Sequence, residues 1–497
     1  MPQQAPEDQV REFATAFRQF LDWVHSAGTR EINEVSALVR EWLGPDGAHH
    51  SVVMRELAAF EHVNVQTAVD AWSSRAGRTV QVRGITVPPH YGGLSLQQLV
   101  AAEALPPLRL AAPALADLPN GPGSTLGCLR LALLLVTDQH GRYVLMIQAP
   151  NEHQPNLLIE VAGLPVGQAQ RLLAELDKLR GELNVYRGHL LDVSLGQMGQ
   201  VILNFADPPG LTSDDVVLPA ATLARVERHA LGVAHHREAL LGVGQHLKRG
   251  LLLYGPPGTG KTHTTRYLLG QMTGYTRLVL TGRSLVAVGP VTDLARALLP
   301  AVIVLEDVDL VAEERSHGPA SSPVLFDLLD AMDGAAPDAD LLFLLTTNRA
   351  DLLEPALAAR PGRVDVAVEI ALPDASARER LLWLYGQSVP LSLSAQDVQL
   401  AVERTDGTTA SFLKELIRRS VLESLHDDPV LTAVTGAHLA RALDDLLDTA
   451  QGVTRTLLGV GVDPADLPAG GALGPGPGRG GWMVHRGVTR RFISSGG

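Results

Sequence analysis

The chain has a single cysteine and few aromatic residues among its 497 positions, and each shortage excludes some kinds of protein or of hydrophobic core. One cysteine, Cys128, excludes an intramolecular disulfide, so the chain lacks the cysteine pattern of a disulfide-stabilised secreted domain. Cys128 lies in the mostly apolar run 126–136, which predicts a buried thiol rather than a nucleophile. Aromatic residues make up only 4% of the chain, so we expect cores of Leu, Val and Ala.

The chain also lacks an excess of positive charge and a long apolar segment. Lys plus Arg number 41 against 54 for Asp plus Glu, which gives a net charge of −13. Proteins that coat nucleic acid need a basic surface, so nucleic acid is not an expected partner. No stretch reaches the roughly 18–20 apolar residues that cross a bilayer, and the first residues lack a secretory signal pattern. We therefore predict a cytoplasmic protein without a membrane partner.

The length predicts several domains, because a domain usually has about 100–150 residues. Apolar residues at three- and four-residue spacing predict helices near 10–24, 31–43 and 52–72, with their apolar stripes in a core. Alternating runs predict strands from 79 onward, including a hairpin over 129–148, and 168–183 reads as a helix. The predicted divisions are a helical segment (1–74), an α+β domain of unassigned role (75–206), a linker (207–217), an alternating α/β domain (218–373), a helical domain (374–450) and a Gly/Pro-rich tail expected to be disordered (451–497).

The clearest motif follows the apolar strand 251–254 and precedes a helical run. It matches the phosphate-binding loop pattern GxxxxGK[ST] at every fixed position and in the strand–loop–helix context that the pattern requires. Such a loop wraps phosphates with backbone N–H groups, while its lysine reaches the β- and γ-phosphates and its hydroxyl binds Mg²⁺. The alternative is a Gly/Pro turn that matches by chance. With the residue that follows it, the predicted nucleotide-binding set is Gly255, Pro256, Pro257, Gly258, Thr259, Gly260, Lys261, Thr262 and His263.

Two carboxylates end a second apolar strand, 301–305. Unpaired charge at the end of a buried strand is costly, but beside Mg²⁺ and a phosphate loop it has a role. Glu306 is the predicted metal ligand together with Thr262, and Asp307 the predicted residue that orients and activates water. A solvated strand end is the alternative.

Weaker signals follow. Asn348 ends a third strand, 341–345 with its Thr-Thr extension, where its amide could bond the γ-phosphate or the attacking water. Alone, a polar residue at the end of a strand is usually a helix cap or a turn. Arg360 and Arg363 flank a Pro-Gly step, and guanidinium groups suit phosphate contact through forked donors. Alone, two such arginines are more often a solvated surface pair.

Taken in order, these residues resemble the AAA+ ATPase superfamily, and within it the clade of AAA proteins proper, over about 218–449. The loop is similar to Walker A, 302–307 to Walker B, Asn348 to sensor 1, and 405–416 to a sensor-2 helix without arginine. The resemblance implies an α/β P-loop NTPase core with a C-terminal α-helical lid, here preceded by the helical segment and the α+β domain. It also implies ATP and Mg²⁺ as cofactors and a homo-oligomeric, hexameric ring, in which Arg360 and Arg363 complete the neighbour's site.

The chain departs from the family pattern in three places, one of which is the short segment between Gly289 and the strand that begins at 301. Its acids read Glu-Asp where most members have Asp-Glu, which is similar to the branch that includes the mitochondrial Bcs-type translocases. The stretch 286–289 stands where protein-threading members carry an aromatic residue, and it has none. We therefore expect an ATP-hydrolysing ring that remodels a client recognised by the N-terminal domains. The alternative is a nucleotide-gated scaffold in which slow hydrolysis is a timer.

Overall fold

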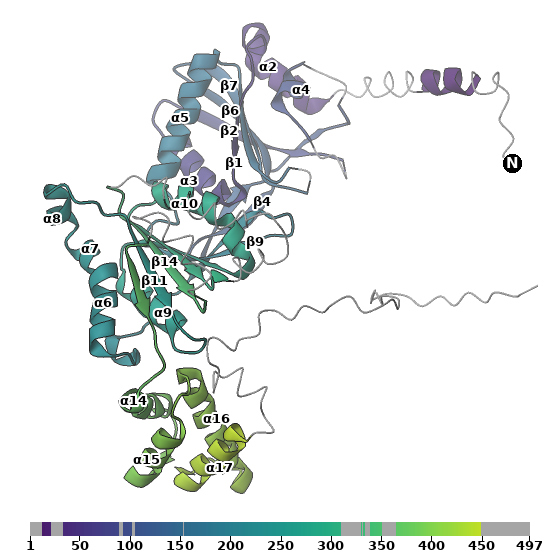
Figure 1. Cartoon of the computed structure of the whole chain (residues 1–497). Helices are drawn as coiled ribbons and strands as arrows, with labels where there is room; N and C mark the ends of the chain where they lie inside the picture. The colour runs from purple at the N-terminus through teal and green to yellow at the C-terminus, as the bar shows by residue number, and fades with distance from the viewer. Residues whose placement is uncertain are drawn as a thin grey trace, which may run out of the picture.

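The computed structural model describes residues 12–20, 33–88, 93–101, 105–152, 154–309, 330, 332, 338–349 and 364–448. Two β-sheets with their helices and a separate helical bundle follow one another along the chain (Figure 1). Within the described ranges, every helix is too short or too polar to cross a membrane.

The first sheet has six strands, all paired antiparallel. It contains the predicted hairpin, in which Asp138 pairs with Gly141 across a tight turn. In spatial order the strands are β1 (Val53–Leu57), β8 (Leu157–Ala162), β7 (Gly141–Gln148), β6 (Leu131–Asp138), β2 (Thr79–Thr86) and β3 (Arg109–Ala111).

Helices cover both faces of this sheet, because its central strands are apolar on both sides. On one face, α3 (His62–Ser73) and α5 (Val166–Glu182) bury Trp72 and Leu173 against β6 and β7. On the other, α2 (Glu34–Ala48) and α4 (Leu96–Ala101) bury Val39 and Leu99. A hairpin of β4 (Leu115–Gly121) and β5 (Ser124–Leu129) extends toward the second sheet, and Cys128 is fully buried there, as predicted.

The predictions for the first 74 residues are partly wrong. Residues 53–57 form strand β1, with alternating burial and an edge pairing to β8, and only after a 3-10 turn, η1 (Ala59–Glu61), does α3 begin. Residues 34–73 therefore belong to the first sheet's domain rather than to a separate helical segment. Residues 12–20 are helical, but their stripe of Phe13, Phe17 and Phe20 is exposed instead of lying in a core.

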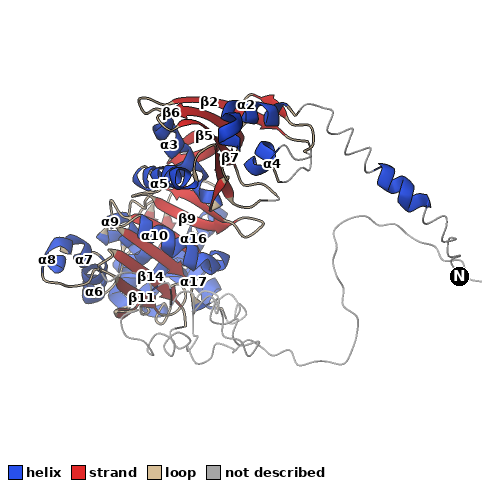
Figure 2. Ribbon diagram, turned by 90° about the horizontal axis from the view of Figure 1, so that it is seen from above, coloured by secondary structure: helices blue, strands red, loops and turns tan. Residues whose placement is uncertain are grey.

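The second sheet has seven strands, and all but the first are parallel (Figures 1 and 2). In spatial order they are β10 (Val201–Ala206), β9 (Leu190–Leu195), β12 (Thr276–Thr281), β13 (Ala301–Glu306), β14 (Leu341–Thr347), β11 (Arg249–Tyr254) and β15 (Val366–Glu369). Helices α6 (Ala220–Ala230) and α9 (Lys261–Gln271) pack on one face. The turn η3 (Gly282–Ala287) and α10 (Val288–Ala297) pack on the other. A short turn η2 (Ser213–Asp215) precedes α6, and α7 (Gly232–His235) and α8 (Arg237–Gly242) follow it.

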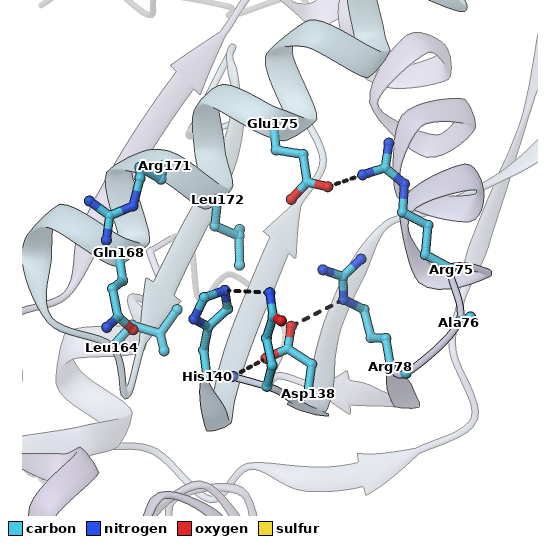
Figure 3. A pocket seen from close by; sticks show the side chains of 12 residues that line it. Arg75, Ala76, Arg78, Asp138, His140, Leu164, Gln168, Arg171, Leu172 and Glu175 are labelled. Atoms are coloured by element: carbon cyan, nitrogen blue, oxygen red, sulfur yellow. Dashed lines mark hydrogen bonds and ion pairs between the residues drawn. The ribbon is translucent and has the colours of Figure 1, made fainter.

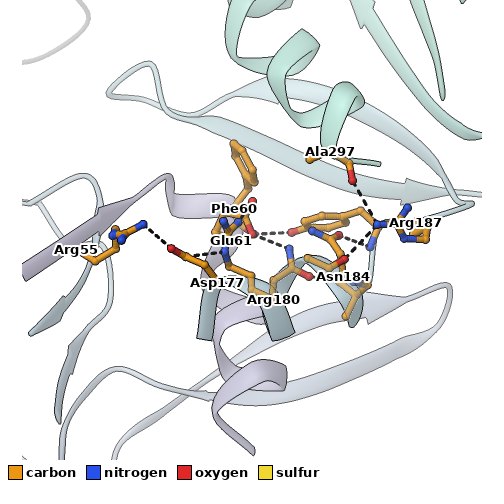
Figure 4. Close-up of polar contacts among 12 residues, drawn as sticks. Arg55, Phe60, Glu61, Asp177, Arg180, Asn184, Arg187 and Ala297 are labelled. Carbon is orange, nitrogen blue, oxygen red and sulfur yellow. Dashed lines mark hydrogen bonds and ion pairs between the residues drawn. The ribbon is translucent and has the colours of Figure 1, made fainter. Parts of the chain in front are cut away.

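The predicted boundary between the α+β domain and the α/β domain does not coincide with the division between the sheets. Strands β9 and β10 fall in the range predicted for the former, but β9 runs parallel to β12 and extends the second sheet. The segment between α5 and β9 joins the two parts through polar contacts (Figure 4). Tyr186 donates its hydroxyl hydrogen to the carbonyl of Phe60 (2.7 Å), and Arg187 donates to the carbonyls of Ala297 (3.3 Å) and Leu299 (3.2 Å).

The helical domain predicted after residue 373 is present, and its helices share a core around Phe412 and Leu416. They are α14 (Ala375–Tyr385), α15 (Ala395–Arg404), α16 (Ala410–Asp427) and α17 (Gly436–Leu447), with a short parallel pair of β16 (Leu391–Ser392) and β17 (Val434–Thr435). The predicted tail lies outside the described residues.

Candidate nucleotide site

The phosphate-loop candidate leaves the second sheet at β11, a strand paired on both sides in parallel, and leads into α9. Gly255 has a positive φ of 145°, and a Cβ there would collide with the carbonyl oxygen of Ile370. The tight exit from β11 therefore requires glycine. Helix α9 begins at Lys261, and no side chain caps its first N–H groups. Uncapped N–H donors at the start of a helix suit an anion.

Lys261 is almost fully buried at the start of α9. Its ammonium group donates to the carbonyl oxygens of Gly255 and Pro256, both at 2.8 Å. Burial lowers the pKa of Lys261 to about 8, although the negative charges of Asp307 and Asp309 oppose that shift. The lysine thus lies between its own loop and the acids that follow β13.

The two predicted metal ligands lie next to each other. Burial and then the neighbouring Asp307 raise the pKa of Glu306. Arg266 and the nearby Thr262 hydroxyl oppose that shift, which places the hydroxyl close to the Glu306 carboxylate. No group of three or more His, Cys, Asp or Glu residues able to hold a metal occurs within the described ranges. One hydroxyl and one carboxylate fit Mg²⁺, which is usually bound by one or two protein ligands with phosphate oxygens and water.

Asp307 follows β13 with a left-handed backbone, φ 52°, which among residues other than glycine is favoured by Asp and Asn. Its N–H donates to the Thr346 hydroxyl at 3.0 Å. The Asn348 amide nitrogen donates to the Asp307 carboxylate at 3.3 Å. The ends of β13 and β14 therefore place the predicted water-activating residue and the predicted sensor in contact.

Asp309 is a site residue for which the sequence analysis gave no role. It is 5% exposed, and its Oδ1 accepts hydrogen bonds from the Thr347 hydroxyl (3.0 Å) and the Asn348 N–H (3.2 Å). It thereby fixes the backbone of the residue that contacts Asp307. The signal was in the sequence, since a third acid two residues after Asp307 is unusual at the end of a buried strand.

The helical bundle also contacts the phosphate loop, at the start of α16. The Ser411 N–H donates to the Gly258 carbonyl oxygen (3.1 Å), and a Cβ on Gly258 would lie 2.9 Å from the Ser411 hydroxyl. This start falls in the segment that resembles a sensor-2 helix. His263, predicted to contact nucleotide, has its Nε2 2.9 Å from the Asp215 carbonyl oxygen in the predicted linker.

Two other predictions concern the ring. Arg360 and Arg363 lie outside the described residues. The stretch 286–289, which lacks the aromatic residue of threading members, spans the end of η3 and the start of α10, and Val286 is exposed there.

Comparison with known proteins agrees with this geometry. Residues 251–372 match the family described as "ATPase family associated with various cellular activities (AAA)". The chain is 27% identical to Protein CdcH of Halobacterium salinarum, over 61% of this chain and 41% of the relative. It is 26% identical to the human ATPase family gene 2 protein homolog A, over 80% and 43%. It is 32% identical to the ATP-dependent zinc metalloprotease FtsH of Alkalihalophilus pseudofirmus, over 41% and 32%.

The chain thus spans less than half the length of these curated relatives. Among solved structures, the FIGL-1 AAA domain matches with a TM-score of 0.41 and 23% identity, over 49% of this chain and 89% of that one.

Proposed function

Because residues 251–372 belong to the AAA+ ATPase superfamily, we propose that the chain binds ATP with Mg²⁺ and hydrolyses it to ADP and phosphate. The observation that carries the proposal is the proximity of the Thr262 hydroxyl to the Glu306 carboxylate, whose pKa the hydroxyl acts to lower. It brings the hydroxyl of the phosphate loop and the carboxylate of the neighbouring strand to one point at the carboxyl edge of a parallel sheet. Ligands bind at that edge in open α/β sheets.

Each residue has a distinct part in this proposal. The N–H groups at the start of α9 and the Lys261 ammonium bind the phosphates, and Thr262 and Glu306 hold Mg²⁺. When bound, Mg²⁺ offsets the negative charge that develops on the phosphate oxygens. Asp307 orients the attacking water and accepts its proton, and Asn348 holds Asp307 and senses the γ-phosphate.

The biological role that we propose is a homo-oligomeric, hexameric ring in the cytoplasm that remodels a protein or complex. Arg360 and Arg363 of one subunit would complete the site of the next. The contact between Ser411 and Gly258 supports coupling of the nucleotide to the helical lid, because the lid touches the loop that surrounds the phosphates. The first sheet's domain would recognise the client.

The hydrolysis proposal is tested by measuring ATP binding and phosphate release from the full chain and its variants. Lys261→Ala should abolish nucleotide binding, because the loop loses its charged donor. Lys178→Ala, which changes an exposed lysine on α5, is the matched control and should behave as the unmodified chain. Tight ATP binding by Lys261→Ala would contradict the assignment.

A second candidate is a nucleotide-gated scaffold with slow hydrolysis. The aromatic-free stretch 286–289 at the start of α10 favours it over a threading machine. Asp307→Asn should bind ATP without turnover and retain its client, and asparagine tolerates the left-handed backbone there. Proteins recovered with this variant and absent with Lys261→Ala would support the remodeller, whereas an assembled ring without a client would support the scaffold.

A further inference from the structure

The first sheet's domain contains a cavity of about 420 Å³, apart from the nucleotide site on the second sheet. Three segments distant in sequence enclose it: the turn after α3, the turn between β6 and β7, and the first half of α5 (Figure 3). Neither the sequence motifs nor the proposed ATPase activity gives this cavity a role.

A partly buried ion pair forms one wall. Arg78 donates from Nε to the Asp138 carboxylate (3.3 Å) and from Nη1 to the Trp72 carbonyl (2.7 Å), and its guanidinium carbon lies 3.9 Å from the centre of the Trp72 ring. Burial alone would raise the pKa of Asp138, but hydrogen bonds from Tyr143, the His140 N–H and Arg78 outweigh it and lower the pKa. Asp138 is therefore charged and keeps Arg78 in place, with its terminal nitrogens toward the cavity (Figure 3).

The opposite wall is formed by α5. Glu175 is paired with Arg75, whereas the side chains of Gln168 and of the exposed Arg171 form no hydrogen bond or ion pair with any residue that the structure describes. The cavity is thus lined by three guanidinium groups and two carboxylates. Their charges sum to +1, since 3 − 2 = 1, and the surplus belongs to the arginine without a partner.

We propose that this cavity binds a compact ligand that carries an oxyanion, a phosphate or a carboxylate, on a small organic body. Arg171 and the remaining N–H donors of Arg78 receive the oxyanion, because a guanidinium group matches its paired oxygens. The Gln168 amide adds a neutral donor. The buried side chains of Leu164 and Leu172 supply the apolar surface for the organic body.

The size of the cavity agrees with such a ligand. Sites for small molecules usually have about 300–1,000 Å³ and a few polar groups on an apolar lining. The same oxyanion could belong to a free small molecule or to an acidic side chain of a bound polypeptide. The inference does not rest on ATP hydrolysis, since no residue of the cavity belongs to the nucleotide site.

The test is calorimetric titration of the full chain with phenyl phosphate and with benzoate, and with benzyl alcohol as the uncharged counterpart. The Lys261→Ala background removes phosphate binding by the loop, so a failure of the ATPase proposal does not affect the result. We expect both anions to bind and the alcohol not to bind. Arg171→Gln should weaken binding about tenfold or more, as for loss of one charge-assisted hydrogen bond.

Arg40→Gln is the matched control, because Arg40 is an exposed arginine on α2 in the same domain. It should bind as the background does, and thermal melting should show that both variants are folded. If the dissociation constants of both anions exceeded about 10 mM, the affinity would be negligible and the proposal would be overturned. Equal affinity of the Arg171→Gln variant and the background would also overturn it. If the anions bind, displacement of phenyl phosphate by a glutamate-containing peptide, but not by its glutamine counterpart, assigns the oxyanion to a polypeptide. Without displacement, it belongs to a small molecule.

Discussion

Replacing Asp309 should affect both stability and turnover, because one carboxylate oxygen accepts two hydrogen bonds in the site. Asp309→Ala leaves the Thr347 hydroxyl and the Asn348 N–H without their acceptor. Each buried donor left unpaired costs about 1–3 kcal/mol, so for the two donors we expect a loss of about 2–6 kcal/mol in the free energy of unfolding. Asn348 then loses its fixed position against Asp307. A shift of about 1 Å at such a site lowers turnover by about a hundredfold.

Asp309→Asn separates these effects, because its amide oxygen can still accept both bonds. It should lose about 1 kcal/mol or less, since the bonds become neutral rather than charge-assisted. Urea unfolding gives the stabilities, and phosphate release at saturating ATP gives the turnover. Asp293→Ala is the control, because Asp293 is an exposed acid on α10. If the alanine and asparagine variants were equally stable and equally active, the positioning role of Asp309 would be refuted.

Three further predictions concern the same part of the chain. As the pH rises through the Lys261 pKa of about 8, the lysine loses its charge, and the dissociation constant for ADP should rise about tenfold per pH unit above 8. A dissociation constant that does not change with pH in an ADP titration would contradict this. Gly258→Ala, which forces a Cβ toward the Ser411 hydroxyl at a positive φ, should weaken ADP binding about tenfold or more by the same titration, while Gly289→Ala in open space should not. Arg277→Met removes a buried guanidinium that donates to the Leu269 and Gly188 carbonyls, and it should cost about 2–4 kcal/mol in the free energy of urea unfolding. Unchanged stability would show that these two bonds do not stabilise the fold.

The phosphate loop and its two partner strands were predictable because their signals are local. Each strand is an apolar run that ends in polar residues, and parallel strands bring those ends to one edge. The proximity of Asn348 to Asp307 follows from that rule alone. The contact between Ser411 and Gly258 could not be predicted in this way. It depends on how the helical bundle lies against the sheet, and no local sequence pattern indicates that arrangement.

The N-terminal half was harder to predict for a physical reason. Residues 53–57 form an edge strand only because β8 offers its backbone, and that partner lies about a hundred residues later. Strands β9 and β10 look in sequence like the other short strands that precede them. Their assignment to the second sheet depends on the pairing of β9 with β12, which is a non-local choice. The hairpin of β6 and β7 was predictable because its two strands are adjacent in the chain.

The pairing of β9 with β12 also determines how mechanical load passes through the molecule. A pull on the first sheet reaches β9 through the short segment after α5, and the parallel bonds to β12 then carry that load in shear. Bonds loaded in shear share the force and must break together, unlike bonds that are opened one after another from an end. The first sheet is therefore linked to the second through a strand that is itself part of the second sheet, and a load applied along β9 would be shared by its paired residues on β12.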